Sequence, residues 1–288
     1  MTTADAAGGN QDARLFAVAL ACLRERDPSR KVERTWHAAT DWRDGSLSLD
    51  GPITPEDLAE PGRPERPELV PPRALEKRSA KGTRGGGKSR AALIHAVAHI
   101  EFNAINLAWD AVYRFRGLPR AYYDDWVRVA DEEAQHFGLM RDRLRSLGHD
   151  YGDFPAHDGL WSMAMRTAGD PLVRMALIPR VMEARGLDVT PGMITRLRDA
   201  GDSETADCLE VILRDEVGHV AAGTRWFQFL CAERGLEPES QYFELLTRYL
   251  GGRIPGPLNL AARRRAGFAE SELERLQALC LKPAPATT

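Results

Sequence analysis

The sequence predicts an all-α protein whose centre is a bundle of four long helices. Three observations support this fold class: apolar residues recur at three- and four-residue spacing from residue 91 onward, alternating strand patterns are nearly absent, and glycine or proline closes the long periodic segments. A chain of 288 residues can bury a large core. We expect an N-terminal helix and an extended segment at 1–89, the bundle at 90–235, and short helices with a tail at 236–288.

The N-terminal part is predicted to contain one helix at 11–27, followed by an irregular segment from about 40 to 90. This segment is rich in glycine, arginine and lysine and has seven prolines between Pro52 and Pro72. Proline removes backbone hydrogen-bond donors and interrupts helices, so an extended conformation is expected. Residues 82–89 match the pattern of a phosphate-binding loop, but no apolar strand precedes them, which favours a flexible basic loop.

The helices of the bundle follow from the apolar periodicity and from the residues that end each segment. Gly117, Gly148 and Gly235 each follow a long periodic segment, as is typical of helix C-termini. A turn is expected at Gly186–Pro191 because it combines glycine with proline. The predicted helices span about 90–116, 120–147, 159–168, 171–185 and 202–233.

Composition narrows the classes of partner and compartment. The net charge of -3 and the pI near 6.2 give no overall field that attracts nucleic acid or an anionic membrane. The four cysteines form no Cys-x-x-Cys pair, so neither a thiolate zinc site nor a disulfide framework is expected. No apolar run approaches the roughly 18 residues of a membrane-spanning helix. These features favour a cytoplasmic protein without a membrane partner.

Two Glu-x-x-His motifs carry the chemistry of the sequence. They are Glu133 with His136, and Glu216 with His219, each on a predicted long helix. A spacing of three residues places the carboxylate and the imidazole on one helix face, where both can bind the same metal ion.

Each motif is preceded by a helix that carries one glutamate within an apolar stripe, Glu101 in the first case and Glu183 in the second. A buried carboxylate is costly unless it is paired or bound to a cation. The separation between the two glutamates is nearly the same in both cases, so the chain reads as two similar helical hairpins. The predicted ligands of two metal ions are Glu101, Glu133, His136, Glu183, Glu216 and His219.

The type of ligand indicates which metal is bound. Carboxylates and imidazoles without thiolates favour iron, or alternatively manganese, over structural zinc, and this ligand pattern is typical of ferritin-like di-metal bundles. Glu132 and Asp215 each lie one residue before a ligand glutamate. We expect them to accept hydrogen bonds from the ligand imidazoles.

An alternative is that the six residues form ordinary buried ion pairs, with Arg180 or Arg185 as partners of the glutamates. Matched spacing on four helices favours the metal site, since ion pairing imposes no such spacing. His95 and His99 also have a zinc-type spacing. They lie about 120° and 160° from Glu101 around the helix, so hydrogen bonding between helices is the favoured role.

Five segments between Ala91 and Cys231 stand out as a set: His95–Glu101, Asp131–Phe137, Tyr151–Trp161, Glu183–Asp188 and Asp215–Val220. Over about half of the chain, this set resembles a bacterial ferritin-like family known mainly as a domain of unknown function. The likeness implies a four-helix bundle with a di-metal site. Glu133–Phe137 is also distantly similar to the tRNA-modifying di-iron hydroxylases.

The expected function is that of a non-haem di-iron, or iron–manganese, oxidase or oxygenase that uses O₂ and a small-molecule substrate. The sequence identifies neither the substrate nor the electron donor. Two alternatives remain open: a tRNA-modifying hydroxylase, for which the basic segment at 73–90 is the motive, and a ferritin-like protein that stores, oxidises or senses iron.

Overall fold

The computed structural model describes residues 14–50, 55–71 and 86–280. Within these ranges the regular structure is helical, and two isolated bridges, Arg14–Ser48 and Leu69–Ala156, extend into no strand. The all-α prediction is therefore confirmed. The chain forms two compact units, Met1–His157 and Asp158–Thr288, and their boundary falls inside the range predicted as one bundle.

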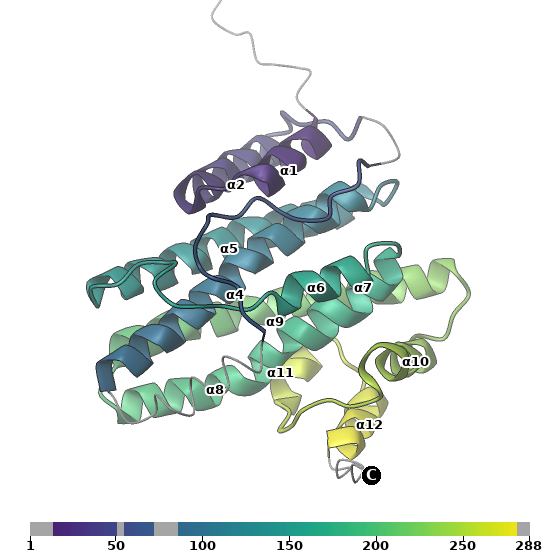
Figure 1. Cartoon of the computed structure of the whole chain (residues 1–288). Helices are drawn as coiled ribbons and strands as arrows, with labels where there is room; N and C mark the ends of the chain where they lie inside the picture. Colours follow the sequence, from purple (N-terminus) through teal and green to yellow (C-terminus); the bar gives the residue numbers. More distant parts are fainter. Residues whose placement is uncertain (1–13, 51–54, 72–85, 281–288) are drawn as a thin grey trace, which may run out of the picture. The chain divides into compact units, whose positions relative to one another are not determined.

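In the described part of the first unit, four helices contact one another in a ring. They are α1 (Leu15–Arg24), α2 (Pro28–Arg43), α4 (Gly86–Arg114) and α5 (Arg120–Ser146). Helix α4 lies along α5, while α1 packs on α4, α2 packs on α5, and α1 contacts α2 (Figure 1). The long predicted helices at 90–116 and 120–147 correspond to α4 and α5.

Helix α2 was not predicted. Its start is well specified, because the Asp27 side chain accepts a hydrogen bond from the Arg30 backbone N–H and Pro28 occupies the first helical turn. Its buried face, however, includes Lys31 and Thr35, which obscure the apolar periodicity. The Lys31 ammonium is buried because it donates to the Cys22 and Leu23 carbonyls and to Asn106.

Some predictions concern residues outside the described ranges. These are the start of the N-terminal helix at 11–13, most of the basic segment with the loop-like motif at 72–85, and the tail at 281–288. Of the irregular segment predicted at about 40–90, residues 44–50 and 55–71 contain no helix, as expected. Residues 40–43 instead end α2 and residues 86–90 begin α4, so the prediction is wrong at both ends of the segment.

One described helix meets the criteria for a membrane span by length and composition. It is the Arg90–Arg114 part of α4, with a mean hydropathy of 1.2, and 78% of the qualifying window is buried inside the protein. The sequence did not predict a helix with these properties, because polar residues interrupt its apolar run. A buried core helix has the same properties.

The second unit is built around two long antiparallel helices. Helix α8 (Ala184–Asp199) packs along α9 (Ser203–Glu233), and the segments that precede α8 pack on α9 as well (Figure 1). The remaining elements are α6 (Gly159–Arg166), α7 (Pro171–Leu177), the π-helix η1 (Ile178–Glu183), α10 (Pro238–Leu250), α11 (Leu260–Arg265) and α12 (Glu270–Cys280).

The predicted turn at Gly186–Pro191 is wrong, because the chain remains helical from Pro171 to Asp199. Pro191 lacks the N–H that would bond the Leu187 carbonyl in a regular helix. The Asn259 side chain donates to that carbonyl instead, at 3.1 Å. A residue distant in the sequence thus replaces the missing helical bond and allows the helix to continue.

Each long hairpin turns at a glycine with positive φ, Gly117 in the first unit and Gly201 in the second. Residues at equal distances from the centre of an antiparallel hairpin lie at about the same level, because both helices rise by the same amount per residue. Glu101 and Glu133 are equally far from Gly117 along the chain. The turn therefore places these two glutamates opposite each other.

Candidate metal centre

Three of the predicted ligands form a buried cluster in the first unit. Glu101 comes from α4, whereas Glu133 and His136 come from α5, and their side chains are 3%, 0% and 1% exposed. Ligand atoms from all three lie within 4.8 Å of one another. The hairpin about Gly117 and the three-residue helical spacing together produce this convergence.

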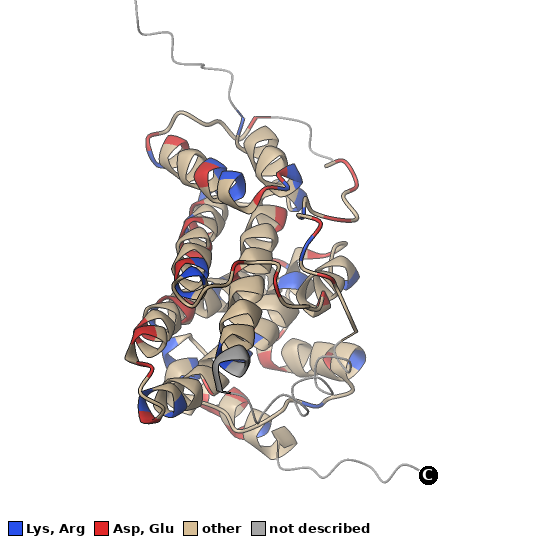
Figure 2. Cartoon of the chain, turned by 60° about the vertical axis from the view of Figure 1, so that its left-hand side comes forward, with Lys and Arg blue, Asp and Glu red and all other residues tan. Residues whose placement is uncertain are grey.

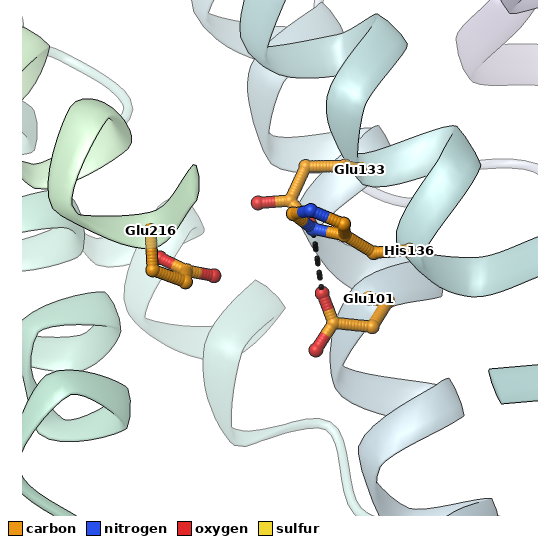
Figure 3. Close-up of side chains that lie close together, drawn as sticks. All are labelled: Glu101, Glu133, His136 and Glu216. Atoms are coloured by element: carbon orange, nitrogen blue, oxygen red, sulfur yellow. Dashed lines mark hydrogen bonds and ion pairs between the residues drawn. The ribbon is translucent and has the colours of Figure 1, made fainter. Parts of the chain in front are cut away.

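The donor atoms of the cluster point toward one another (Figure 3). His136 Nδ1 lies 3.3 Å from Glu133 Oε2 and 3.5 Å from Glu101 Oε2, the ion pair drawn as a dashed line. Figure 3 also draws Glu216, which belongs to the second unit and is described with it below.

The electrostatics of the cluster show how costly it is without a cation. Burial, reinforced by the negative charge of Glu133, raises the pKa of Glu101 to about 8. Burial acts to lower the pKa of His136, but its hydrogen bonds to Glu101 and Glu133 outweigh this effect and raise that pKa to about 12. The buried cluster therefore favours the protonated forms of Glu101 and His136, because two carboxylates and one imidazole lie close together away from solvent.

These residues fit a metal ion in both chemistry and spacing. Two carboxylate oxygens and one imidazole nitrogen are donors that iron and manganese accept. An octahedral ion with ligands at about 2.1 Å sets neighbouring donor atoms about 3 Å apart. The observed 3.3 and 3.5 Å need only a small contraction. A divalent cation would replace the protons and neutralise the buried carboxylates.

The second unit repeats the sequence pattern, but its three predicted ligands, which all lie in described parts of the chain, do not form a cluster in which ligand atoms from all three lie within 4.8 Å of one another. Glu216 and His219 lie on α9, are 11% and 0% exposed at their side chains, and place Oε2 and Nδ1 3.7 Å apart. Glu183 is the last residue of η1 and is half-buried. Glu183 and His219 are equally far from Gly201 along the chain, so the antiparallel hairpin sets them at the same level.

A close contact between η1 and α9 fixes this level. Pro179 and Gly223 are also equidistant from Gly201, and a Cβ atom at Gly223 would lie 2.2 Å from Pro179 Cγ. Only glycine permits this approach. The π-helical turn carries the chain from Pro179 to Glu183, and such turns occur frequently at functional sites.

The two acidic neighbours of the motifs contact arginines. Glu132 accepts hydrogen bonds from Arg128 at 2.8 and 3.1 Å, and Asp215 accepts from Arg214 at 2.9 and 3.1 Å. Their proposed role at the ligand imidazoles stays a prediction.

His95 and His99 anchor the loop after α5 instead of joining two helices. His95 Nε2 accepts from the Gly152 backbone, whereas His99 Nδ1 lies 2.9 Å from the Tyr151 hydroxyl and His99 Nε2 lies 3.1 Å from the His157 carbonyl. Burial lowers the pKa of each imidazole to about 4, so both are neutral.

Sequence reasoning gave Tyr151 no role, although its ring contacts the residues next to the ligands. Its centroid lies 5.2 Å from that of Phe102 and 5.1 Å from that of Phe137, which directly follow Glu101 and His136. An aromatic residue directly follows both Glu101 and His136, which could have indicated an aromatic cluster beside the ligands. Nothing in the sequence around Tyr151 indicated that its ring joins this cluster.

The two arginines considered as alternative partners are engaged elsewhere. Arg180 pairs with Glu272 at 2.7 Å. Arg185 donates to the carbonyls of Pro255 and Pro257 and lies 3.7 Å from Asp188. The contacts described for these arginines therefore give no support to a simple ion-pair role for the six candidate residues.

Comparisons with known proteins identify a family without a described activity. A family model named "Protein of unknown function (DUF455)" matches residues 24–274. A protein of Haemophilus influenzae described as "Uncharacterized protein" is 46% identical over 218 residues, which cover 73% of this chain and 74% of that protein. No solved structure matches this chain.

Proposed function

This chain belongs to the DUF455 family, and from the chemistry of its buried carboxylates we propose that it is a ferritin-like di-metal protein that catalyses an O₂-dependent oxidation. The observation that supports the proposal most is the cluster of Glu101, Glu133 and His136, in which three donors converge in a buried site. Two carboxylates and an imidazole in one dry site are more readily explained by a bound cation than by a structural need.

We extend the proposal to both halves of the chain. Each unit supplies a glutamate and a Glu-x-x-His motif on a hairpin with a glycine turn. These six residues match the ligand types of a ferritin-like di-metal protein, and we assign Glu101, Glu133 and His136 of the first unit to one ion and Glu183, Glu216 and His219 of the second unit to the other.

When bound, reduced iron or manganese would supply the electrons that reduce and activate O₂ for oxidation of the substrate. The residues of the chain hold the ions, balance their charge and exclude bulk water. His136 uses Nδ1 toward the carboxylates, so its ring orientation is fixed before an ion arrives. The rings of Phe102, Phe137 and Tyr151 contact one another, and Phe102 and Phe137, which directly follow Glu101 and His136, are buried.

Modification of tRNA receives less support from the charge distribution. Lysine or arginine occurs together with aspartate or glutamate on most of the helices drawn in Figure 2. Helix α11 carries three arginines and no acidic residue, but Arg263 is buried and pairs with Asp188, and Arg264 pairs with Glu270. Binding to a phosphate backbone depends on clustered cations. We therefore propose a small-molecule substrate.

Metal content tests the proposal directly. Wild type and the variants Glu133→Ala and Glu216→Ala are purified from cells grown with iron and manganese and are analysed by mass spectrometry for metals. We expect about two ions per chain in wild type. Both variants should lose metal, because each lacks a central ligand of one half-site.

Glu210→Ala is the matched control. Glu210 lies on α9 like Glu216, but its side chain is 51% exposed and pairs with Arg198 at the surface. It should keep the metal content of wild type. A metal-free wild type that is folded, or equal metal content in all four proteins, would contradict the di-metal proposal. Oxygen uptake after addition of Fe(II) then separates a redox centre from a passive binding site.

A further inference from the structure

The C-terminal segment of the second unit contacts the helical chain around Glu183 both before and after that residue. Arg180, three residues before Glu183, contacts α10 and α12. Leu187 and Asp188, four and five residues after it, contact Asn259 and Arg263. The short C-terminal helices thus attach at two points that flank one predicted ligand.

The first attachment point is a buried guanidinium in an aromatic cage. Arg180 is 0% exposed and pairs with Glu272 Oε1 at 2.7 Å. Its Cζ lies 4.7, 4.1 and 4.5 Å from the ring centroids of Phe227, Tyr242 and Phe268. The Tyr242 hydroxyl also donates to the Arg180 carbonyl at 3.1 Å. Side chain and backbone of this π-helical residue are therefore both fixed.

The second attachment point lies in the first turns of α8. Arg263 donates to both Asp188 oxygens, at 3.0 and 2.7 Å, and both side chains are almost fully buried. Asn259 donates its backbone N–H to Asp188 and its side-chain amide to Leu187. Phe268 connects the two points, because its ring contacts both the Arg180 and the Arg263 guanidinium.

Stability alone is a weak reason for this arrangement. Buried ion pairs are often no better for stability than apolar residues of the same volume, because two charges must be desolvated. They do impose a defined geometry. Two such pairs flank Glu183, and the close contact at Gly223 sets Glu183 level with His219. We infer that the buried pairs specify the position of Glu183.

We propose that the segment Pro255–Glu272 is a positioning clamp that holds the π-helical turn so that Glu183 reaches its metal. Arg180, Glu272, Asp188 and Arg263 are its positioning residues, and none of them is proposed as a ligand. The inference rests on the proposed di-metal function. It assigns to the C-terminal helices a role in metal affinity that the motifs do not show.

Equilibrium dialysis of the full chain against Mn(II) tests the clamp. Glu272→Gln removes the charge that pairs with Arg180, and the double variant Arg180→Met with Glu272→Leu replaces the pair by apolar side chains that preserve packing. We expect either variant to keep one ion and to bind the other about 10- to 100-fold more weakly, as for residues that orient metal ligands. The double variant guards against loss of folding in the single one.

Asp170→Asn is the matched control. Asp170 pairs with Arg234 through two bonds of 2.8 Å in the same unit, but it lies at the start of α7 and asparagine preserves its capping role. This variant should retain both affinities for Mn(II). Thermal unfolding of the metal-free proteins shows whether affinity changes independently of stability.

A cycle with Glu183→Gln separates positioning from a general effect. If the clamp acts through Glu183, adding Glu272→Gln to Glu183→Gln leaves Mn(II) affinity unchanged. A further loss in that background overturns the clamp, as does wild-type affinity in the clamp variants while wild type itself binds two ions. If wild type binds no Mn(II) or iron, the proposed function fails and the clamp fails with it.

Discussion

Replacing Gly223 with alanine should destabilise the second unit, although alanine is normally the better helix former. Gly223 lies in the interior of α9, where alanine gains about 1 kcal/mol of helix stability over glycine. Here, however, the new Cβ would lie 2.2 Å from Pro179 Cγ and 2.3 Å from Pro179 Cβ. Ordinary contact begins at 3.4 Å, and the proline ring cannot rotate away.

The helices must therefore separate, and overpacking of this kind costs about 1–3 kcal/mol or more. Gly186→Ala is the matched comparison, because the methyl group added at that helical glycine would meet no atom of another segment within 4 Å and should gain about 1 kcal/mol. Because the helix-propensity gain is common to both variants, we expect them to differ by the overpacking cost, about 1–3 kcal/mol or more. For a unit of this size each kcal/mol corresponds to roughly 2–4 °C or more in unfolding midpoint.

Far-UV circular dichroism during heating of the metal-free proteins measures the difference. The same displacement should move Glu183 away from the level of His219, so Gly223→Ala should also weaken Mn(II) binding while Gly186→Ala should not. Equal stabilisation by both substitutions would refute the close approach of η1 and α9. Destabilisation with unchanged Mn(II) affinity would refute the link between that contact and the ligand.

Lys31, Asn259 and the bound ions give three further predictions. Burial lowers the pKa of Lys31 from 10.5 to about 7. Between these pH values the folded chain binds fewer protons than the unfolded chain, so the free energy of unfolding rises with pH. In denaturant titrations wild type should gain roughly 2 kcal/mol of stability from pH 7 to pH 9 relative to Lys31→Met, and the same pH dependence in both proteins would contradict this. Asn259→Ala should cost about 1–3 kcal/mol, because it leaves the Leu187 carbonyl without its donor and removes the side-chain cap of α11. Adding Pro191→Ala should recover the part of the loss that comes from Leu187 by restoring a helical N–H, and no recovery would contradict this role of Asn259. If the proposed ions are bound, chelation should lower the unfolding midpoint of wild type, because the ions bind only the folded chain, and should lower that of Glu133→Ala by less, because this variant keeps the ligands of one half-site only. An equal shift in both would argue against specific sites.

The sequence was most informative where structure is determined locally. The long hairpins and the Glu-x-x-His pairs follow from helical periodicity and from glycine at the turns, and the buried position of Glu101 follows from the apolar stripe around it. Sequence reasoning failed where distant residues decide the outcome. The Asn259 side chain donates to the carbonyl that Pro191 leaves unbonded in its helix, and Glu272 accepts a hydrogen bond from Arg180, which lies 92 residues away in the sequence.

Helix α2 shows a different limit. Its buried face includes Lys31 and Thr35, which a hydrophobicity pattern scores as exposed. Lys31 can be buried because the carbonyls at the end of α1 and the Asn106 side chain accept hydrogen bonds from its ammonium group. Those acceptors become apparent only after the helices have packed, so the local pattern contained no usable signal for this face.

The two half-sites are similar in sequence but differ in geometry, which bears on how the metals bind. In the first hairpin Glu101 and Glu133 are equidistant from the turn glycine, whereas in the second Glu183 lies one helical turn farther from Gly201 than Glu216 does. This offset of three positions corresponds to about 4.5 Å along a helix. Glu183 is thus level with His219 instead of with Glu216, and the π-helical turn ends at it. An exact repeat would offer two equivalent positions, whereas this offset leads us to propose that the two expected ions would bind with unequal affinity and that the weaker position would depend on Glu183.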